Sequence, residues 1–146
     1  MLIQEVSYLT ADYKKTLQLR NNILREPLGK KLTSQDTQEE SEHLHFATLY
    51  LDSAIACVIA VPLEGLAKIK LRQIAVATEW QRQGLGLSLI NYVENTLYPR
   101  GTREIELSAR LETKGFYQKL GYKTVNSVYL EIGIEHIKMH KYLTKN

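Results

Sequence analysis

The segment that most constrains the fold of this chain is residues 71–98, where a short apolar run, a glycine loop and an amphipathic stretch follow one another. Residues 71–76 are apolar and partly β-branched, which predicts a strand with a buried face. After a turn at residues 77–80 come Gly84 and Gly86, and then apolar residues that recur with the spacing of a helix face. Two glycines therefore lie where a strand leads into a helix.

That arrangement suits the binding of an anion. The first N–H groups of a helix have no intrahelical partner, and the helix dipole adds partial positive charge there. Glycines let an anion approach the backbone without meeting a Cβ atom, and Arg82 supplies a full positive charge. The segment therefore predicts a phosphate or pyrophosphate site. The alternative is a tight turn that uses glycine only for its geometry.

Two common nucleotide-binding loops do not match this segment. A P-loop needs a lysine directly after its last glycine, and Leu87 follows Gly86 here. A dinucleotide fingerprint needs a third glycine where Leu89 stands, and it belongs to a leading strand–helix–strand unit, whereas two strand candidates precede this loop. A nucleotide-binding domain therefore stays a rival interpretation, which binding of ATP or NAD would reveal.

The pattern that does match is Gln/Arg-x-x-Gly-x-Gly/Ala, because Gln81, Gly84 and Gly86 fill its three places. This resembles the acetyl-CoA loop of the GNAT acetyltransferase superfamily. The stretch FYQKLGY at residues 116–122 is similar to the family's Leu/Phe-Tyr-x-Lys-x-Gly-Phe pattern, with Tyr122 for the usual Phe. Residues 133–139 fit the Gly-Ile-x-His-x-x-Met ending of ElaA-like and YjcF-like members, and the resemblance spans about residues 3–139.

Apolar patterning along the chain predicts the order β-α-β-β-β-α-β-α-β-β, which matches the GNAT fold. The expected strands are residues 2–9, 43–52, 53–62, 67–76, 104–108, 122–125 and 128–133, and the expected helices are residues 12–25, 85–97 and 112–120. Thr10 is the expected N-cap of the first helix, residues 30–42 a polar loop, and residues 138–146 a polar tail that frays. We predict a single α/β (α+β) domain over residues 1–146, with a mixed central sheet of about seven strands and helices on both faces.

The resemblance implies that acetyl-CoA is the co-substrate and that the acetyl group passes directly to an amine of a small molecule or peptide. The cofactor-binding residues that it implies are Ile74, Ala75 and Val76 beside the pantetheine arm, Gln81, Arg82, Gln83, Gly84, Leu85, Gly86, Leu87 and Ser88 at the pyrophosphate, and Arg110 and Tyr117. Arg110 and Thr113 depart from the family's frequent Asn and Ala, which leaves the side-chain part of that contact open. An acyl-CoA-binding sensor or partner domain without significant turnover is the alternative function.

Acetyl transfer to an amine also needs a group that takes the amine proton and a donor for the departing thiolate. Tyr117 is the candidate general acid because it matches the family's tyrosine, and ring packing with a local hydrogen bond is the alternative. No motif marks the general base. The candidates are His136 and Glu131 near the C-terminus and His43 and His45 beside the polar loop, with a structural role as the alternative for each.

Two arginines and the cysteine have side chains that could also take part in function. Arg20 and Arg25, expected on the first helix, would suit an acidic acceptor, although a solvated helix face explains them more simply. Cys57 lies in an apolar run, so we predict a buried small side chain and no covalent intermediate. A single cysteine allows no intramolecular disulfide, and His43 with His45 has no obvious third ligand, so no metal is expected.

Composition narrows the expected partners. The net charge of the 146 residues is +3 and no run rich in Lys or Arg stands out, which argues against nucleic acid. The first residues lack the features of a signal peptide, and no apolar stretch approaches the ~20 residues of a membrane span. We therefore expect a cytoplasmic protein with no membrane partner, and analogy with the family admits a homodimer.

Overall fold

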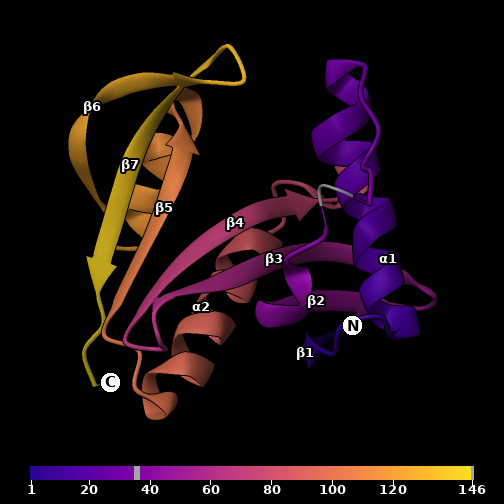
Figure 1. The fold of residues 1–146 in the computed structure, drawn as a ribbon, viewed down its shortest axis with the longest axis horizontal. Coiled ribbons are helices and arrows are strands. Elements are labelled where there is room, and N and C mark those ends of the chain that lie inside the picture. The colour runs from indigo at the N-terminus through magenta and orange to yellow at the C-terminus, as the bar shows by residue number, and fades with distance from the viewer. Residues whose placement is uncertain (35–36, 146) are drawn as a thin grey trace. The chain divides into compact units, whose positions relative to one another are not determined.

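The computed structural model describes residues 1–34 and 37–145, and within them strands and helices follow one another in the predicted order (Figure 1). The elements are β1 (Leu2–Val6), α1 (Ala11–Arg20), β2 (Leu44–Tyr50), β3 (Ser53–Glu64), β4 (Lys68–Val76), α2 (Leu85–Leu97), β5 (Glu104–Arg110), α3 (Lys114–Lys119), β6 (Lys123–Glu131) and β7 (Ile134–Tyr142). The seven strands are hydrogen bonded in the order β1-β2-β3-β4-β5-β7-β6, and both parallel and antiparallel pairs occur. The predicted mixed sheet is therefore confirmed.

Contacts within the chain group it into two units, each built from separate segments. The first unit comprises Met1–Val61 and Gln73–Asn95, and the second comprises Pro62–Arg72 and Thr96–Asn146. The single domain expected over residues 1–146 stays a prediction.

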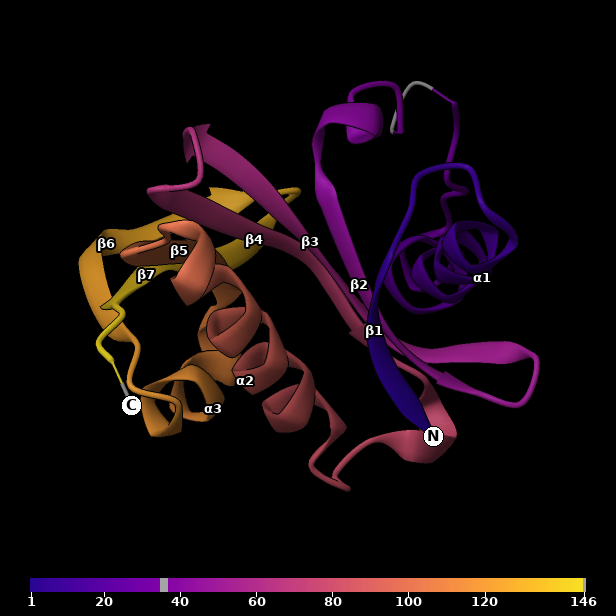
Figure 2. The same cartoon turned by 90° about the horizontal axis from the view of Figure 1, so that it is seen from below.

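In the first unit, α1 and α2 cover opposite faces of β1, β2 and β3 (Figure 2). The side chains of neighbouring residues in a strand point to opposite faces of the sheet. Two neighbouring residues of β2 accordingly contact different helices. The ring of His45 lies 4.9 Å from that of Tyr13 on α1, and the ring of Phe46 lies 6.2 Å from that of Tyr92 on α2. The expectation of helices on both faces of the sheet is thus confirmed within this unit.

The predicted apolar stripe of α2 is buried. Its members are Leu85, Leu89, Ile90, Val93 and Leu97, each exposed by 6% or less. The apolar run of β3 is buried too, and within it Cys57 is a free thiol whose pKa burial raises to about 12. Cys57 is therefore the small core side chain that its surroundings predict.

The first helix is shorter than predicted and carries a buried ion pair. Thr10 is its N-cap, as expected, and accepts a hydrogen bond from the backbone N–H of Tyr13. The α-helix ends at Arg20, and Asn21–Arg25 continue as π-helix. Arg20 is only 1% exposed and donates two hydrogen bonds of 2.7 Å to the carboxylate of Glu40. The prediction of a solvated or acceptor-facing Arg20 was therefore wrong.

The Arg20–Glu40 pair attaches the end of the polar segment to α1. This segment was predicted as a loop over residues 30–42. Burial alone would raise the pKa of Glu40, but hydrogen bonds from Arg20 and Tyr13 outweigh it and hold that pKa below its ordinary value. Glu40–Glu42 forms a short 3-10 turn, and Gln35 and Asp36 of the same segment lie outside the described residues. The end of the segment is thus anchored to α1.

In the second unit, β7 lies between β5 and β6 (Figure 1), and the first half of β4 pairs in parallel with β5. One face of these strands is apolar and buried, through Ile69, Leu71, Ile105, Leu107, Ile137 and Met139. The other face is charged: Glu106 lies 3.3 Å from the Lys68 ammonium and 3.6 Å from that of Lys138. Glu106 is only 8% exposed, so the two lysines compensate a buried carboxylate on this face.

The last two strands correct the sequence-based prediction. The expected strands 122–125 and 128–133 are one strand, β6, in which Asn126 with φ of 68° causes an irregularity, not a turn. The turn is at Ile132 and Gly133, whose φ values of 53° and 70° suit a two-residue hairpin. The polar tail from residue 138 belongs to β7 up to Tyr142, because Met139 faces the core between polar neighbours, and Asn146 lies outside the described residues.

None of the helices in residues 1–34 and 37–145 is long and apolar enough to cross a membrane.

Candidate active site

The glycine loop belongs to the first unit and exposes its backbone to solvent. Residues 81–84 are exposed, and two of them adopt left-handed conformations, Arg82 with φ of 64° and Gly84 with φ of 81°. A Cβ atom added at Gly84 would meet no atom within 4 Å, so the space beside it is open. The first turn of α2 follows, where the backbone N–H of Ser88 bonds to Gly84 at 3.0 Å. The N–H groups that precede Ser88 are thus free of intrahelical acceptors.

Two side chains attach this loop to the segment before it. Gln81 donates through Nε2 to the backbone oxygen of Val76 at 3.0 Å, and Gln83 donates to that of Glu79 at 3.3 Å. The glutamine of the motif therefore sets the position of the loop relative to the end of β4. A side chain that fixes backbone in this way pre-organises an anion site without contacting the anion.

Strand β4 changes its course at Gln73, before the residues expected beside the pantetheine arm. Gln73 has φ of 55°, a strained value for a residue with a side chain. The parallel pairs of β4 with β5 run from Lys68↔Glu104 to Leu71↔Leu107. Ile74, Ala75 and Val76 follow the irregular residue, and the sequence carried no signal for it because glutamine has no preference for this conformation.

Tyr117, on α3 of the second unit, is 8% exposed and lies in a cluster of aromatic rings. Its ring centroid is 5.0 Å from that of Phe116 and 6.1 Å from that of Tyr122. Burial raises the pKa of Tyr117 to about 12, so the phenol keeps its proton at neutral pH. The group can therefore donate a hydrogen bond, as a donor to a thiolate must.

His136 and Glu131, the two candidate bases near the C-terminus, lie together. The β6–β7 turn brings Glu131 Oε2 to 3.6 Å from His136 Nε2. His136 Nδ1 lies 2.7 Å from the backbone oxygen of Ile134, which can only accept, so Nδ1 donates. In the neutral ring this leaves Nε2 unprotonated and able to take a proton, with the Glu131 carboxylate beside it.

A further pair of side chains adjoins His136 and was missed by the sequence analysis. The hydroxyl groups of Ser108 on β5 and Tyr129 on β6 form a hydrogen bond. The ring of Tyr129 lies 6.2 Å from that of His136, its neighbour across the strand pair. Tyr129 stands two residues before Glu131, so strand alternation was the signal that would have placed both on one face.

Arg110 ends β5 opposite His136 in the strand register. Thr113, which like Arg110 departs from the family pattern, donates through its hydroxyl to the backbone oxygen of Arg110 at 2.8 Å. This bond fixes the backbone where β5 leads into α3. The unusual threonine therefore has a structural role at this end of the strand.

His45 has a structural role, which was the alternative to its being the general base. It is 3% exposed, and its Nε2 lies 2.8 Å from the backbone oxygen of Glu40. Burial is the main reason that the pKa of His45 lies below its ordinary value. His45 thus supports the core of the first unit, and His43 is half-buried just before β2. Among the described residues, no group of three His, Cys, Asp or Glu side chains is placed to hold a metal ion.

Comparison with known sequences identifies the family of this chain. The sequence profile described as an acetyltransferase (GNAT) domain matches residues 12–143. Among curated proteins, the uncharacterized protein YyaT of Bacillus subtilis (strain 168) is 31% identical over 77 residues, which cover 53% of this chain and 52% of YyaT. The chain thus spans about half the length of the first curated relatives that it matches.

Solved structures share the fold. Escherichia coli ElaA has a TM-score of 0.82 at 20% identity, with 96% of this chain and 98% of that chain covered. An aminoglycoside 6'-N-acetyltransferase complexed with coenzyme A has a TM-score of 0.80 at 22% identity, with 100% and 99% covered. The profile covers most of the residues, and both structures carry the same architecture. The chain therefore belongs to the GNAT acetyltransferase family.

Proposed function

We propose that this chain is an acetyl-CoA-dependent N-acetyltransferase that moves the acetyl group directly to an amine. The observation that carries the proposal is the exposed glycine loop at the start of α2, whose backbone is free to meet an anion, in a chain of the GNAT family. A helix start with left-handed residues beside it offers several N–H groups to a pyrophosphate.

Cofactor binding belongs mainly to the first unit. Residues 81–88 bind the pyrophosphate through their N–H groups, and Arg82 adds a positive charge. Ile74, Ala75 and Val76 offer strand backbone to the amides of the pantetheine arm. The assignment of Arg110 and Tyr117 to the cofactor rests on the family pattern. The structure of the relative complexed with coenzyme A is consistent with this cofactor class.

The proton chemistry is assigned to the second unit. The amine nitrogen attacks the thioester carbon, the carbon–sulfur bond breaks, and the amine proton goes to His136 Nε2. Glu131, 3.6 Å away, stabilises the imidazolium. Tyr117 donates a hydrogen bond to the departing thiolate. Because the pKa of Tyr117 is about 12 and an ordinary thiol has a pKa of about 8.5, the tyrosine keeps its proton and acts as a hydrogen-bond donor.

Calorimetric titration with acetyl-CoA tests the proposal, with ATP and NAD as control ligands. We expect micromolar binding of acetyl-CoA alone. Binding of ATP or NAD in its place would contradict the cofactor assignment, and so would the absence of any binding by the folded protein.

Turnover separates the enzyme from an acyl-CoA-binding sensor. Release of the coenzyme A thiol is followed with a panel of amines, and a transferase releases thiol only when a suitable amine is present. Tight binding without release across the panel would favour the sensor. A homodimer and a cytoplasmic location also stay predictions, which light scattering and cell fractionation test.

A further inference from the structure

Three neighbouring strands of the second unit bring polar side chains together on the face that carries His136. In the strand register, His136 on β7 lies opposite Arg110 on β5 and opposite Tyr129 on β6. Ser108 stands two residues before Arg110, so strand alternation puts it on the same face. The hydroxyl groups of Ser108 and Tyr129 are joined by a hydrogen bond. The proposed proton transfers do not use this bond.

The Ser108–Tyr129 bond crosses a whole strand. In the sheet β7 lies between β5 and β6, and neighbouring strands are about 4.8 Å apart, so about 10 Å separates β5 from β6. The tyrosine side chain therefore extends over β7 to meet Ser108. Its ring lies beside that of His136, with 6.2 Å between the centroids and an angle of 32° between the planes. The bond thus connects two strands that are not neighbours in the sheet.

The bond lies directly after the irregular part of β6. The pairing of β6 with β7 stops at Val125 and resumes at Tyr129, and the register shifts in between. Asn126 has φ of 68°, and all residues from 126 to 131 are exposed. Because β6 is also an edge strand, backbone pairing on one side alone gives weak control of its register. Tyr129 is thus anchored at the residue where control is needed.

The register after this bulge decides whether His136 has a carboxylate beside it. Glu131 follows Tyr129 by two residues on the same face, and its Oε2 lies 3.6 Å from His136 Nε2. A slip of one residue would turn both side chains to the opposite face of the sheet. Glu131 is 47% exposed, so water screens its attraction to His136 and this contact holds the register only weakly. The bond from Ser108 to Tyr129 is better placed to hold it.

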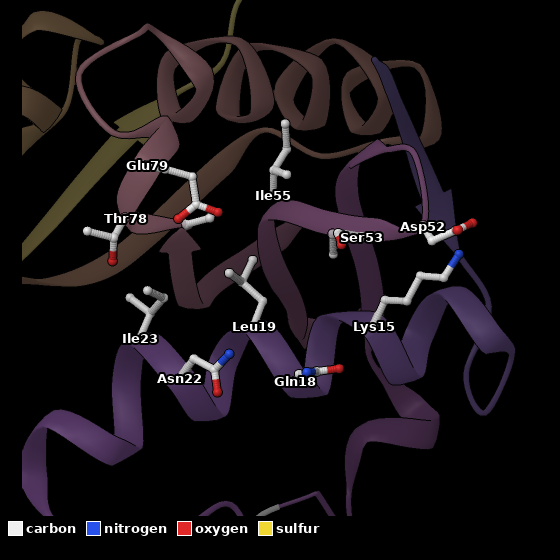
Figure 3. A pocket seen from close by; sticks show the side chains of 12 residues that line it. Lys15, Gln18, Leu19, Asn22, Ile23, Asp52, Ser53, Ile55, Thr78 and Glu79 are labelled. Carbon is white, nitrogen blue, oxygen red and sulfur yellow. The ribbon is translucent and has the colours of Figure 1, made fainter.

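The polar side chains around a cavity of the first unit lack such an arrangement. Figure 3 shows this cavity of about 280 Å³, with Asp52 and Glu79 on its rim and Leu19 and Ile55 between them. Both carboxylates are exposed, and Figure 3 shows them apart from each other. Exposed side chains that do not bond to one another keep their rotamer freedom. A bond such as that between Ser108 and Tyr129 instead fixes the groups that it joins.

We propose that Ser108 and Tyr129 are positioning residues for His136: their hydrogen bond fixes the register of β6 after its bulge and keeps Glu131 beside the imidazole. The catalytic consequence rests on the proposed N-acetyltransferase function. The pair acts through His136 and does not have to touch either substrate. Control of the register is a property of the folded chain, so it is measurable without a cofactor.

Hydrogen exchange on the full chain, without acetyl-CoA, tests control of the register. The variants Ser108→Ala and Tyr129→Phe each remove one hydroxyl group. Exchange reports the population of locally opened states, and the net contribution of an ordinary hydrogen bond corresponds to about a fivefold change in such a population. The protected amides of residues 129–131 should therefore exchange about fivefold faster in both variants. Those of residues 123–125, before the bulge, should be unchanged.

The matched control is Ser127→Ala, which removes an exposed hydroxyl group within the bulge and should exchange as the wild type does. Ser108→Thr keeps a hydroxyl group and should preserve the wild-type rates. The double variant Ser108→Ala with Tyr129→Phe should exchange no faster than either single variant, because both remove the same bond. Unchanged exchange at residues 129–131 in the two single variants would overturn the inference.

Steady-state kinetics test the catalytic consequence. Ser108→Ala and Tyr129→Phe should each lower kcat about fivefold, because both Glu131 and the Tyr129 ring shift relative to the imidazole, and the KM for acetyl-CoA should not change. Ser108→Thr should restore kcat. In a His136→Gln background, Ser108→Ala should cause no further loss. An equal loss with and without His136 would overturn the positioning role.

Failure of the proposed function has a different signature. If the folded wild type bound no acetyl-CoA, that function would be overturned, while faster exchange at residues 129–131 in the variants would still support control of the register by the bond. If the wild type is active and the variants exchange faster with unchanged kcat, the positioning role is overturned instead.

Discussion

The glycine loop and the Glu131–His136 pair supply chemistry in different ways. The loop is one contiguous segment that presents backbone N–H groups, and its geometry depends on left-handed residues such as Gly84. The pair consists of side chains from two strands, which meet at 3.6 Å because a turn at Ile132 and Gly133 sets the register. A site made of backbone N–H groups tolerates changes of side chain but not changes of backbone φ. A pair of side chains depends instead on the identity of the two residues. Substitutions in the two regions should therefore separate cofactor binding from turnover.

The largest expected effect is at the side-chain pair. His136→Gln should lower kcat about 100-fold, the ordinary contribution of a general base, and leave the Kd for acetyl-CoA unchanged. Steady-state kinetics and calorimetry on the same preparation measure both quantities. His43→Gln is the matched control, because it removes a half-buried imidazole that the proposed mechanism does not use. Equal losses of kcat in both variants would remove His136 from the mechanism.

Tyr117→Phe should lower kcat about 30-fold, because a hydrogen bond to a charged group contributes about 2 kcal/mol. The pKa of Tyr117 is about 12, so the phenol stays protonated and the ratio of wild-type to variant rates should be constant from about pH 6 to about pH 10. Tyr122→Phe is the control, since the family pattern has Phe there. A ratio that falls steeply within this range would contradict the donor role.

Gly84→Val should raise the Kd for acetyl-CoA about tenfold with a smaller change in kcat. A β-branched residue at φ of 81° costs about 1–2 kcal/mol in the left-handed region, and its side chain enters the space open to the anion. Gly65→Val, at φ of 55° in the turn before β4, imposes similar strain away from the loop. If both variants fold and weaken binding alike, the loop has no special role.

Glu131→Gln should have the smallest effect, a decrease of about threefold in kcat, because its side chain is 47% exposed and water screens its charge. In the double variant with His136→Gln, the loss should equal that of His136→Gln alone. Such non-additivity is measured by a double-mutant cycle and shows that Glu131 acts through His136. Additive losses would give Glu131 a separate role.

Features built from neighbouring residues were predicted well. The Thr10 cap, the buried stripe of α2 and the buried thiol of Cys57 all depend on local pattern, and the structure confirms each. The glycine loop belongs to the same class, because strand, glycines and helix are contiguous. Its conformation follows from the residues that compose it.

Features that join distant residues were not predicted. Arg20 and Glu40 are 20 residues apart, and nothing local indicates that they form a buried pair. The last strands were misplaced because Asn126 suggests a turn, and only pairing with β7 shows that β6 continues through it. Ser108 and Tyr129 meet from different strands and were missed for the same reason.

The sequence by itself determined the family, the order of the elements and the segment assigned to the cofactor, because backbone preferences and apolar periodicity act over a few residues. Only the tertiary structure decided which charges are buried and which base candidate has a carboxylate beside it. Those features depend on strand register and helix packing, in which a shift of one residue turns a side chain to the opposite face.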